Sequence, residues 1–250
     1  MISAVHAEWT KLRTLAGPAW LLFATAVLTA GLSWLAVAAM TCPTTGCTAD
    51  GTKLSLTGVQ LGQAVIAVLA VLVVGAEYST GMIRTTMTAL PRRGIVLLAK
   101  ATVLTAGALV AAALGVLGSV LAGRLILPAK GFIAPPLSVM LRADVGSILY
   151  LTLIALLSLG VATMVRDSAA AIGVVLGVLY LAPILLDVVS DPTWDRHIEQ
   201  VAPSIAGLYV QHTIGLHDLP IGPWAGLCVL AAWAVGALLA GGVLLELRDV

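Results

Sequence analysis

The sequence predicts an all-α integral membrane protein with six transmembrane helices, and its composition is the first reason. Of the 250 residues, 60% are hydrophobic and only 10% are charged, and the mean hydropathy is +1.07. Soluble domains usually carry about 25% charged residues, so a soluble globular protein is excluded. The second reason is that six stretches lack charge, and each can hold the roughly 20 apolar residues of a spanning helix: 14–49, 54–76, 101–123, 145–165, 168–186 and 219–245.

Residues 1–18 predict an amphipathic helix that lies in the membrane interface. Val5, Trp9 and Leu12 recur at helical spacing, and charged residues occupy other faces. Trp9 suits an anchor at headgroup level. The first span is expected to start near Ala19. Its apolar run is too long for a secretory signal peptide and ends without a cleavage site. The whole chain, 1–250, is expected to form one transmembrane domain.

The other spans are expected at 57–76, 97–121, 144–165, 168–187 and 223–245. Segment 122–142 contains three prolines and is expected to be mainly loop. Segment 188–221 is too polar and too broken to span. It predicts short re-entrant helices in the outer leaflet, which are tolerated where protein covers their backbone.

Basic residues predict the orientation, because Lys and Arg concentrate in cytoplasmic loops. With both termini in the cytoplasm, five basic residues lie outside and eight lie inside, close to helix ends. We therefore expect a multi-pass protein of the cell (plasma or inner) membrane with both termini cytoplasmic. The eight inner residues are Lys11, Arg13, Arg84, Arg92, Arg93, Lys100, Arg166 and Arg248.

Cys42 and Cys47 lie in the first outer loop, CPTTGC, where proline and glycine favour a tight turn. A disulfide between them is expected in an oxidising exterior. A metal site is disfavoured, because no histidine or third thiol lies nearby.

The sequence contains no GxxxxGK[ST] phosphate loop, no HExxH and no GxSxG. We therefore expect no enzyme activity, no cofactor and no nucleic-acid partner. The six spans also have essentially no charge in their middle thirds, where ion-driven carriers usually keep ionisable residues. If this protein moves something against a gradient, the energy must come from another subunit.

The segment 77–94, EYSTGMIRTTMTALPRRG, interrupts the apolar pattern between the second and third spans. Gly81 permits a sharp bend. After it, Ile83, Met87 and Leu90 recur at helical spacing until Pro91, which predicts a short amphipathic helix. One interpretation is an interfacial loop whose arginines rest on anionic lipid. The other is a helix that a cytosolic partner grips in a groove, so that a push moves both neighbouring spans.

This pattern resembles ABC-2 type transporter permeases. The similar features are E-Y-x-x-G-x-I-R, the corner LPRRG and the later Lys100, together with EWTKLR near the start and LLELRDV at the end. In topology the resemblance covers the whole chain, although the motifs cover only some forty residues. Unlike larger members, this chain has no extended outer domain.

The resemblance implies a coupling helix between spans two and three that docks on a separate ATPase, which binds the ATP. It also implies two permease subunits, identical or paralogous, with two ATPases, an exporter role, and re-entrant helices at 188–221. The residues that it assigns to ATPase coupling are Glu77, Tyr78, Gly81, Arg84, Met87, Arg92 and Arg93.

A weakly polar stripe is a candidate substrate pathway. Thr25, Thr29 and Ser33 share one face of the first span, and Gln60 and Gln63 lie in the outer half of the second. The alternative is ordinary hydrogen bonding between helices. A charge-poor, aliphatic interior favours an apolar or amphiphilic cargo.

The sequence thus favours the permease subunit of an ATP-driven exporter, with an ATPase, a second permease and membrane lipid as partners. The alternative is a non-transporting scaffold or sensor module whose segment 77–94 docks a cytosolic protein. A membrane enzyme is disfavoured, because no set of catalytic groups is evident.

Overall fold

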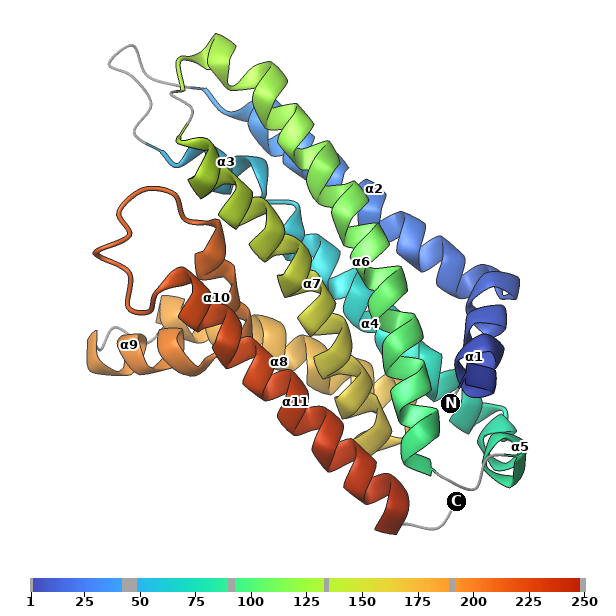
Figure 1. Cartoon of the computed structure of the whole chain (residues 1–250). Helices are drawn as coiled ribbons and strands as arrows, with labels where there is room; N and C mark the ends of the chain where they lie inside the picture. Colours follow the sequence, from blue (N-terminus) through green and yellow to red (C-terminus); the bar gives the residue numbers. More distant parts are fainter. Residues whose placement is uncertain (1, 42–48, 90–92, 133–134, 189–191, 248–250) are drawn as a thin grey trace.

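The computed structural model describes residues 2–41, 49–89, 93–132, 135–188 and 192–247, and these ranges contain helices and turns but no strand. Figure 1 shows slanted helices, with α1, α5 and both termini near one end of the molecule and α3, α9 and α10 toward the other. The helices are α1 (Ile2–Thr14), α2 (Ala16–Ala39), α3 (Gly51–Ser55), α4 (Val59–Ser79), α5 (Met82–Ala89), α6 (Arg93–Ile126), η1 (Pro128–Lys130), α7 (Leu137–Val165), α8 (Ser168–Val188), α9 (Pro192–Val201), α10 (Pro203–Leu208), η2 (Tyr209–Gln211) and α11 (Pro223–Leu247).

Five helices, α2, α4, α6, α7 and α11, are long and apolar enough to cross a membrane. Among the described residues, α8 has a shorter apolar stretch, Ser168–Ile184. The expectation of an all-α multi-pass membrane protein is confirmed at this level.

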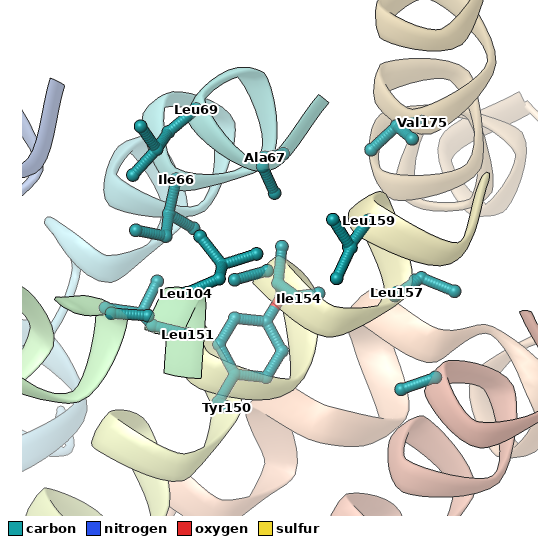
Figure 2. Close-up of a cluster of buried hydrophobic side chains, with 14 of the residues drawn as sticks. Ile66, Ala67, Leu69, Leu104, Tyr150, Leu151, Ile154, Leu157, Leu159 and Val175 are labelled. Atoms are coloured by element: carbon teal, nitrogen blue, oxygen red, sulfur yellow. The ribbon is translucent and has the colours of Figure 1, made fainter. Parts of the chain in front are cut away.

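Helix α7 lies at the centre of the packing, because it contacts α4, α6, α8 and α11. Figure 2 shows the apolar cluster that these contacts bury. Its fully buried large side chains include Ile66 and Leu69 from α4, Leu104 from α6, Tyr150, Leu151, Ile154 and Leu159 from α7, Leu179 from α8 and Leu230 from α11. The cluster holds the spans together before any polar contact is considered.

Helix α2 packs on α4 and α6 through small and hydroxyl residues. A Cβ on Gly58 would lie 1.9 Å from the carbonyl oxygen of Thr29, so only glycine allows this approach. The Gly58 N–H donates to Ser33 Oγ at 3.0 Å, and Ser119 Oγ donates to the same oxygen at 2.9 Å. Close approach and shared hydroxyls together explain how α2 is fixed.

At the α3 end, Asp50 joins two distant parts of the chain. Its carboxylate caps α3 by accepting from the N–H groups of Thr52 and Lys53, both at 3.1 Å. It also accepts from the N–H of Thr213 at 2.5 Å, from the Thr213 hydroxyl at 2.7 Å and from the N–H of Ile214 at 3.2 Å. Burial works to raise the pKa of Asp50, but these hydrogen bonds outweigh it and hold the pKa below the usual 3.8.

The helix ends differ from the expected ones at two places. Helix α2 begins at Ala16, so Pro18 lies in its first turn, where a missing N–H costs nothing. Helix α6 continues to Ile126 and α7 begins at Leu137, so the intervening loop is shorter than the expected 122–142. The charges that bounded the apolar stretches mark where hydrocarbon is expected to end, whereas a helix can continue beyond it.

Candidate functional site

Four charged side chains meet where α1, α4 and α6 come together, and we call them the ion cluster: Glu8, Lys11, Glu77 and Lys100. The Lys100 ammonium donates to Glu77 Oε1 at 2.6 Å and to Glu8 Oε2 at 2.9 Å. The Lys11 ammonium donates to Glu77 Oε1 at 2.7 Å and to Glu8 Oε1 at 2.9 Å. Each ammonium thus bridges both carboxylates, and the ion cluster has no net charge.

The ion cluster is largely buried. The side chain of Lys100 is 3% exposed, that of Glu77 7% and that of Glu8 8%, whereas that of Lys11 is 30% exposed. Buried charges are tolerated only when they are paired. Here the pairing ties α1 to the ends of α4 and α6, which are joined through α5.

Helix α1 turns the face that carries Glu8 and Lys11 toward the bundle. Ala4 and Glu8 are buried and Lys11 is partly buried, while Trp9 is 45% exposed. The spacing 4, 8, 11 is itself helical, so the sequence held a signal for this face. The contact of Glu8 and Lys11 with α4 and α6 was not predicted, and the role of Trp9 as a membrane anchor stays a prediction.

Lys11 is the accessible member of the ion cluster and lies outside the spans. Burial works against its charge, but the hydrogen bonds to Glu77 and Glu8 outweigh burial and raise the pKa of Lys11 above the usual 10.5. Its ammonium has three donors, and two of them are used in these contacts.

Tyr78 and Arg93 connect the helices around the ion cluster to the neighbouring ends of α7 and α11. The Arg166 guanidinium lies 5.7 Å from the centre of the Tyr78 ring, within range of a cation–π contact. Arg166 also donates to the Leu244 carbonyl at 3.2 Å, and Arg93 donates to the Leu245 carbonyl at 2.7 Å. These bonds link the ends of α4, α6, α7 and α11.

The expected bend and short helix after Glu77 are present. Gly81 has a φ of +70°, which favours glycine, and α5 follows directly. On α5, Ile83 is buried, while Met82, Thr85 and Thr88 are exposed. A helix of this kind, buried on one side and open on the other, can receive a partner.

Some of the expected coupling residues are only partly described or lie outside the description. Arg84 and Met87 lie on α5, and the description of this helix does not extend to their side chains. Arg92 lies outside the described residues. Their role in docking stays a prediction.

A cavity of about 400 Å³ opens beside the ion cluster, between α1, α2, α4 and α6. Its walls are mainly aliphatic, and all four residues of the ion cluster contribute to its lining. The volume falls within the roughly 300–1,000 Å³ of small-molecule sites.

The residues of the expected pathway are divided between buried and exposed positions. Thr25, Thr29 and Ser33 are fully buried within the chain, and Gln63 is 2% exposed and accepts a hydrogen bond from Tyr150. Gln60 is exposed. Packing between helices accounts for the buried contacts, and a pathway along this stripe stays a prediction.

The expected disulfide between Cys42 and Cys47 lies outside the described residues. Cys228 is a free, exposed cysteine. Within the part of the chain that the structure covers, no group of three or more His, Cys, Asp or Glu side chains is placed to hold a metal ion.

Neither comparison with known proteins adds to this geometry: no model of a known family matches the chain, and no curated protein matches it.

Proposed function

We propose that this chain is the permease subunit of an ATP-driven ABC transporter that exports an apolar or amphiphilic substrate. A separate ATPase would bind ATP and dock on α5. The observation that carries the proposal is the ion cluster, because it joins α1, α4 and α6 into one body beside α5.

The mechanical argument starts from the connections around α5. This helix follows α4 after a bend at Gly81 and precedes α6 in the chain. A force applied to its exposed side would reach both spans through the backbone. The ion cluster would carry the same movement to α1. Lys100 on α6 contacts Glu8 of α1, and Glu77 on α4 contacts Lys11 of α1.

We further propose that α8 is the sixth span. Its 21 residues correspond to about 31 Å at 1.5 Å per residue, close to the roughly 30 Å of a hydrocarbon core. Six spans would return the chain to its starting side, which fits the termini lying near one end of the molecule (Figure 1). The charge distribution favours the cytoplasm for that end, and α9 and α10 would then face the outer leaflet.

The proposal is tested by isolating the chain with a candidate ATPase. The chain should be purified in mild detergent from cells that co-express a phosphate-loop ATPase encoded next to it, and ATP turnover should be measured in liposomes. Thr85→Glu places a charge on the exposed side of α5. We expect it to reduce both co-purification and stimulated turnover severalfold.

Thr57→Glu is the matched control, because Thr57 is also an exposed threonine but lies beside α3 at the other end. It should leave the complex intact. If Thr85→Glu and Arg84→Ala both retained full ATPase binding, α5 would not be the docking element. Stable binding of a partner without substrate-dependent turnover would instead support a scaffold or sensor module.

A further inference from the structure

We propose that the cavity beside the ion cluster binds an uncharged, single-chain amphiphile through a head group that both donates and accepts a hydrogen bond, such as a hydroxyl. This assignment goes beyond the proposed function, because it holds whether or not the chain is a permease. It rests on the shape of the cavity, on two polar groups at its edge and on the charge balance of the ion cluster.

The walls of the cavity suit an aliphatic chain. They are formed mainly by side chains of α2, α4 and α6 and by the residue that joins α1 to α2: Leu15, Leu21, Leu69, Leu72, Val73 and Leu104. At the roughly 30 Å³ that one water molecule occupies in the liquid, a volume of about 400 Å³ has room for about 13 heavy atoms. That corresponds to one alkyl chain of about a dozen carbons with a small head.

Two members of the ion cluster offer complementary hydrogen-bonding groups to that head. Lys11 is partly exposed, and its third ammonium N–H has no acceptor among the described residues. Glu77 is the reverse case, since both lysines donate to its Oε1 while its buried Oε2 has no hydrogen-bond partner in the described part of the chain. A buried acceptor without a donor is costly.

A hydroxyl can serve both groups. It would accept from Lys11, which is accessible from the cavity. Glu77 Oε2 is covered in the present arrangement. The hydroxyl would therefore donate to it after the carboxylate turns toward the cavity. The two contacts would lie close together, since Lys11 Nζ is only 2.7 Å from the other oxygen of the same carboxylate.

Charge balance favours a neutral head over an ionised one. Two carboxylates and two ammonium groups already cancel in the ion cluster. An ammonium head would add a third positive charge beside two lysines, and a carboxylate head would face the unpaired oxygen of Glu77. Either addition leaves a net charge in a poorly solvated place, which is unfavourable.

Photolabelling tests the site in the full chain, reconstituted in phosphatidylcholine nanodiscs. The probe is a twelve-carbon primary alcohol with a diazirine in mid-chain, and mass spectrometry maps the labelled residues. We expect labels on cavity residues of α1, α2, α4 and α6. The competitors are 1-dodecanol and its isomer undecyl methyl ether, which accepts a hydrogen bond but cannot donate one. Dodecanol should compete roughly tenfold better, the effect of one hydrogen bond to a charged acceptor.

One substitution and one control locate the binding. Val73→Trp fills the cavity while all four residues of the ion cluster are kept, and it should remove most of the labelling. Leu61→Trp adds the same ring to the same helix at an exposed position and should leave labelling unchanged. Labelling of Val73→Trp at the level of the unaltered chain would overturn the site. Equal competition by alcohol and ether would overturn the head-group assignment, and that comparison needs no variant.

A further arm identifies the source of the ligand. Competition by dioleoylglycerol, which has a hydroxyl head and two chains, would support the site and its hydroxyl head group but would overturn the assignment to a single-chain amphiphile. Competition by dodecanol alone would support the site and identify a single-chain amphiphile. Stronger competition by dodecylamine or dodecanoate than by dodecanol would contradict the proposed charge balance.

Discussion

Replacing Lys100 by Met should destabilise the protein far more than the same replacement of Lys11. Both lysines bridge Glu8 and Glu77 with similar distances, so contacts alone predict equal effects. The difference lies in burial, because the side chain of Lys100 is 3% exposed and that of Lys11 is 30% exposed. Methionine keeps an unbranched, flexible side chain that is one heavy atom shorter, and it removes the ammonium charge and its donors.

The magnitude follows from the charges that remain. Removing one partner of a buried ion pair typically costs about 3–5 kcal/mol, because the other charge stays buried without compensation. A partly exposed pair is worth about 0–1 kcal/mol. For a chain of this size, about 2–4 °C of melting temperature corresponds to 1 kcal/mol. We therefore expect Lys100→Met to lower the melting temperature by about 6–20 °C, and Lys11→Met by no more than about 4 °C.

The assay is thermal unfolding in one mild detergent, followed by the loss of the monodisperse peak in size-exclusion chromatography. The double variant Glu77→Gln/Lys100→Met removes one negative and one positive charge, so it should recover part of the loss. Equal shifts for the two single lysine variants would refute the burial argument. If Lys100→Met left the melting temperature unchanged, the ion cluster would not be what holds α1 to the spans.

Three further outcomes follow from the described contacts. Gly58→Ala should prevent close packing of α2 and lower the expression of folded protein severalfold. Gly173→Ala, whose added Cβ would meet nothing within 4 Å, should leave expression unchanged. The fluorescence of a fusion protein measures both. The folded-state pKa of Asp50 lies below 3.8, so its stabilising contribution is complete above that value and is lost as the pH falls through the lower folded-state pKa. Asp50→Ala should therefore flatten the acid limb of a stability–pH curve and leave its upper part parallel to that of the unaltered chain. For Lys11 the sign is opposite: its folded-state pKa lies above 10.5, so its contribution is present below 10.5 and is lost as the pH rises through the higher value. Lys11→Met should flatten the alkaline limb.

The sequence predicted the apolar helices and the bend at Gly81 because both depend on local features. Uncharged stretches of sufficient length define spans, and glycine marks a backbone conformation that other residues avoid. The helix ends were less predictable. Arg124 and Asp144 bounded the apolar stretches, yet both lie inside helices, because a helix can extend past the hydrocarbon into water.

The ion cluster depends on tertiary contacts, and the sequence indicated only its parts. Glu77 and Lys100 were marked as members of a motif, but their pairing with α1 was not predicted. The apolar pattern of α1 predicted a membrane-facing side that includes Trp9, and it did not indicate which side contacts the protein. In a membrane, apolar side chains are stable against lipid, whereas charged ones need partners inside the protein. Glu8 therefore points inward and Trp9 outward.

The length of α6 has a consequence for the membrane in which this protein works. Its 34 residues extend for about 51 Å, which exceeds a roughly 30 Å hydrocarbon layer even at the largest common tilts of about 40°. The uncharged part of the helix, 101–123, spans about 34 Å and fits with a modest tilt. Lys100 then lies at the edge of the oily layer, one residue from the part that matches it. A thicker bilayer would draw its ion pairs toward hydrocarbon, so lipid chain length should tune how firmly the amino-terminal helix is held.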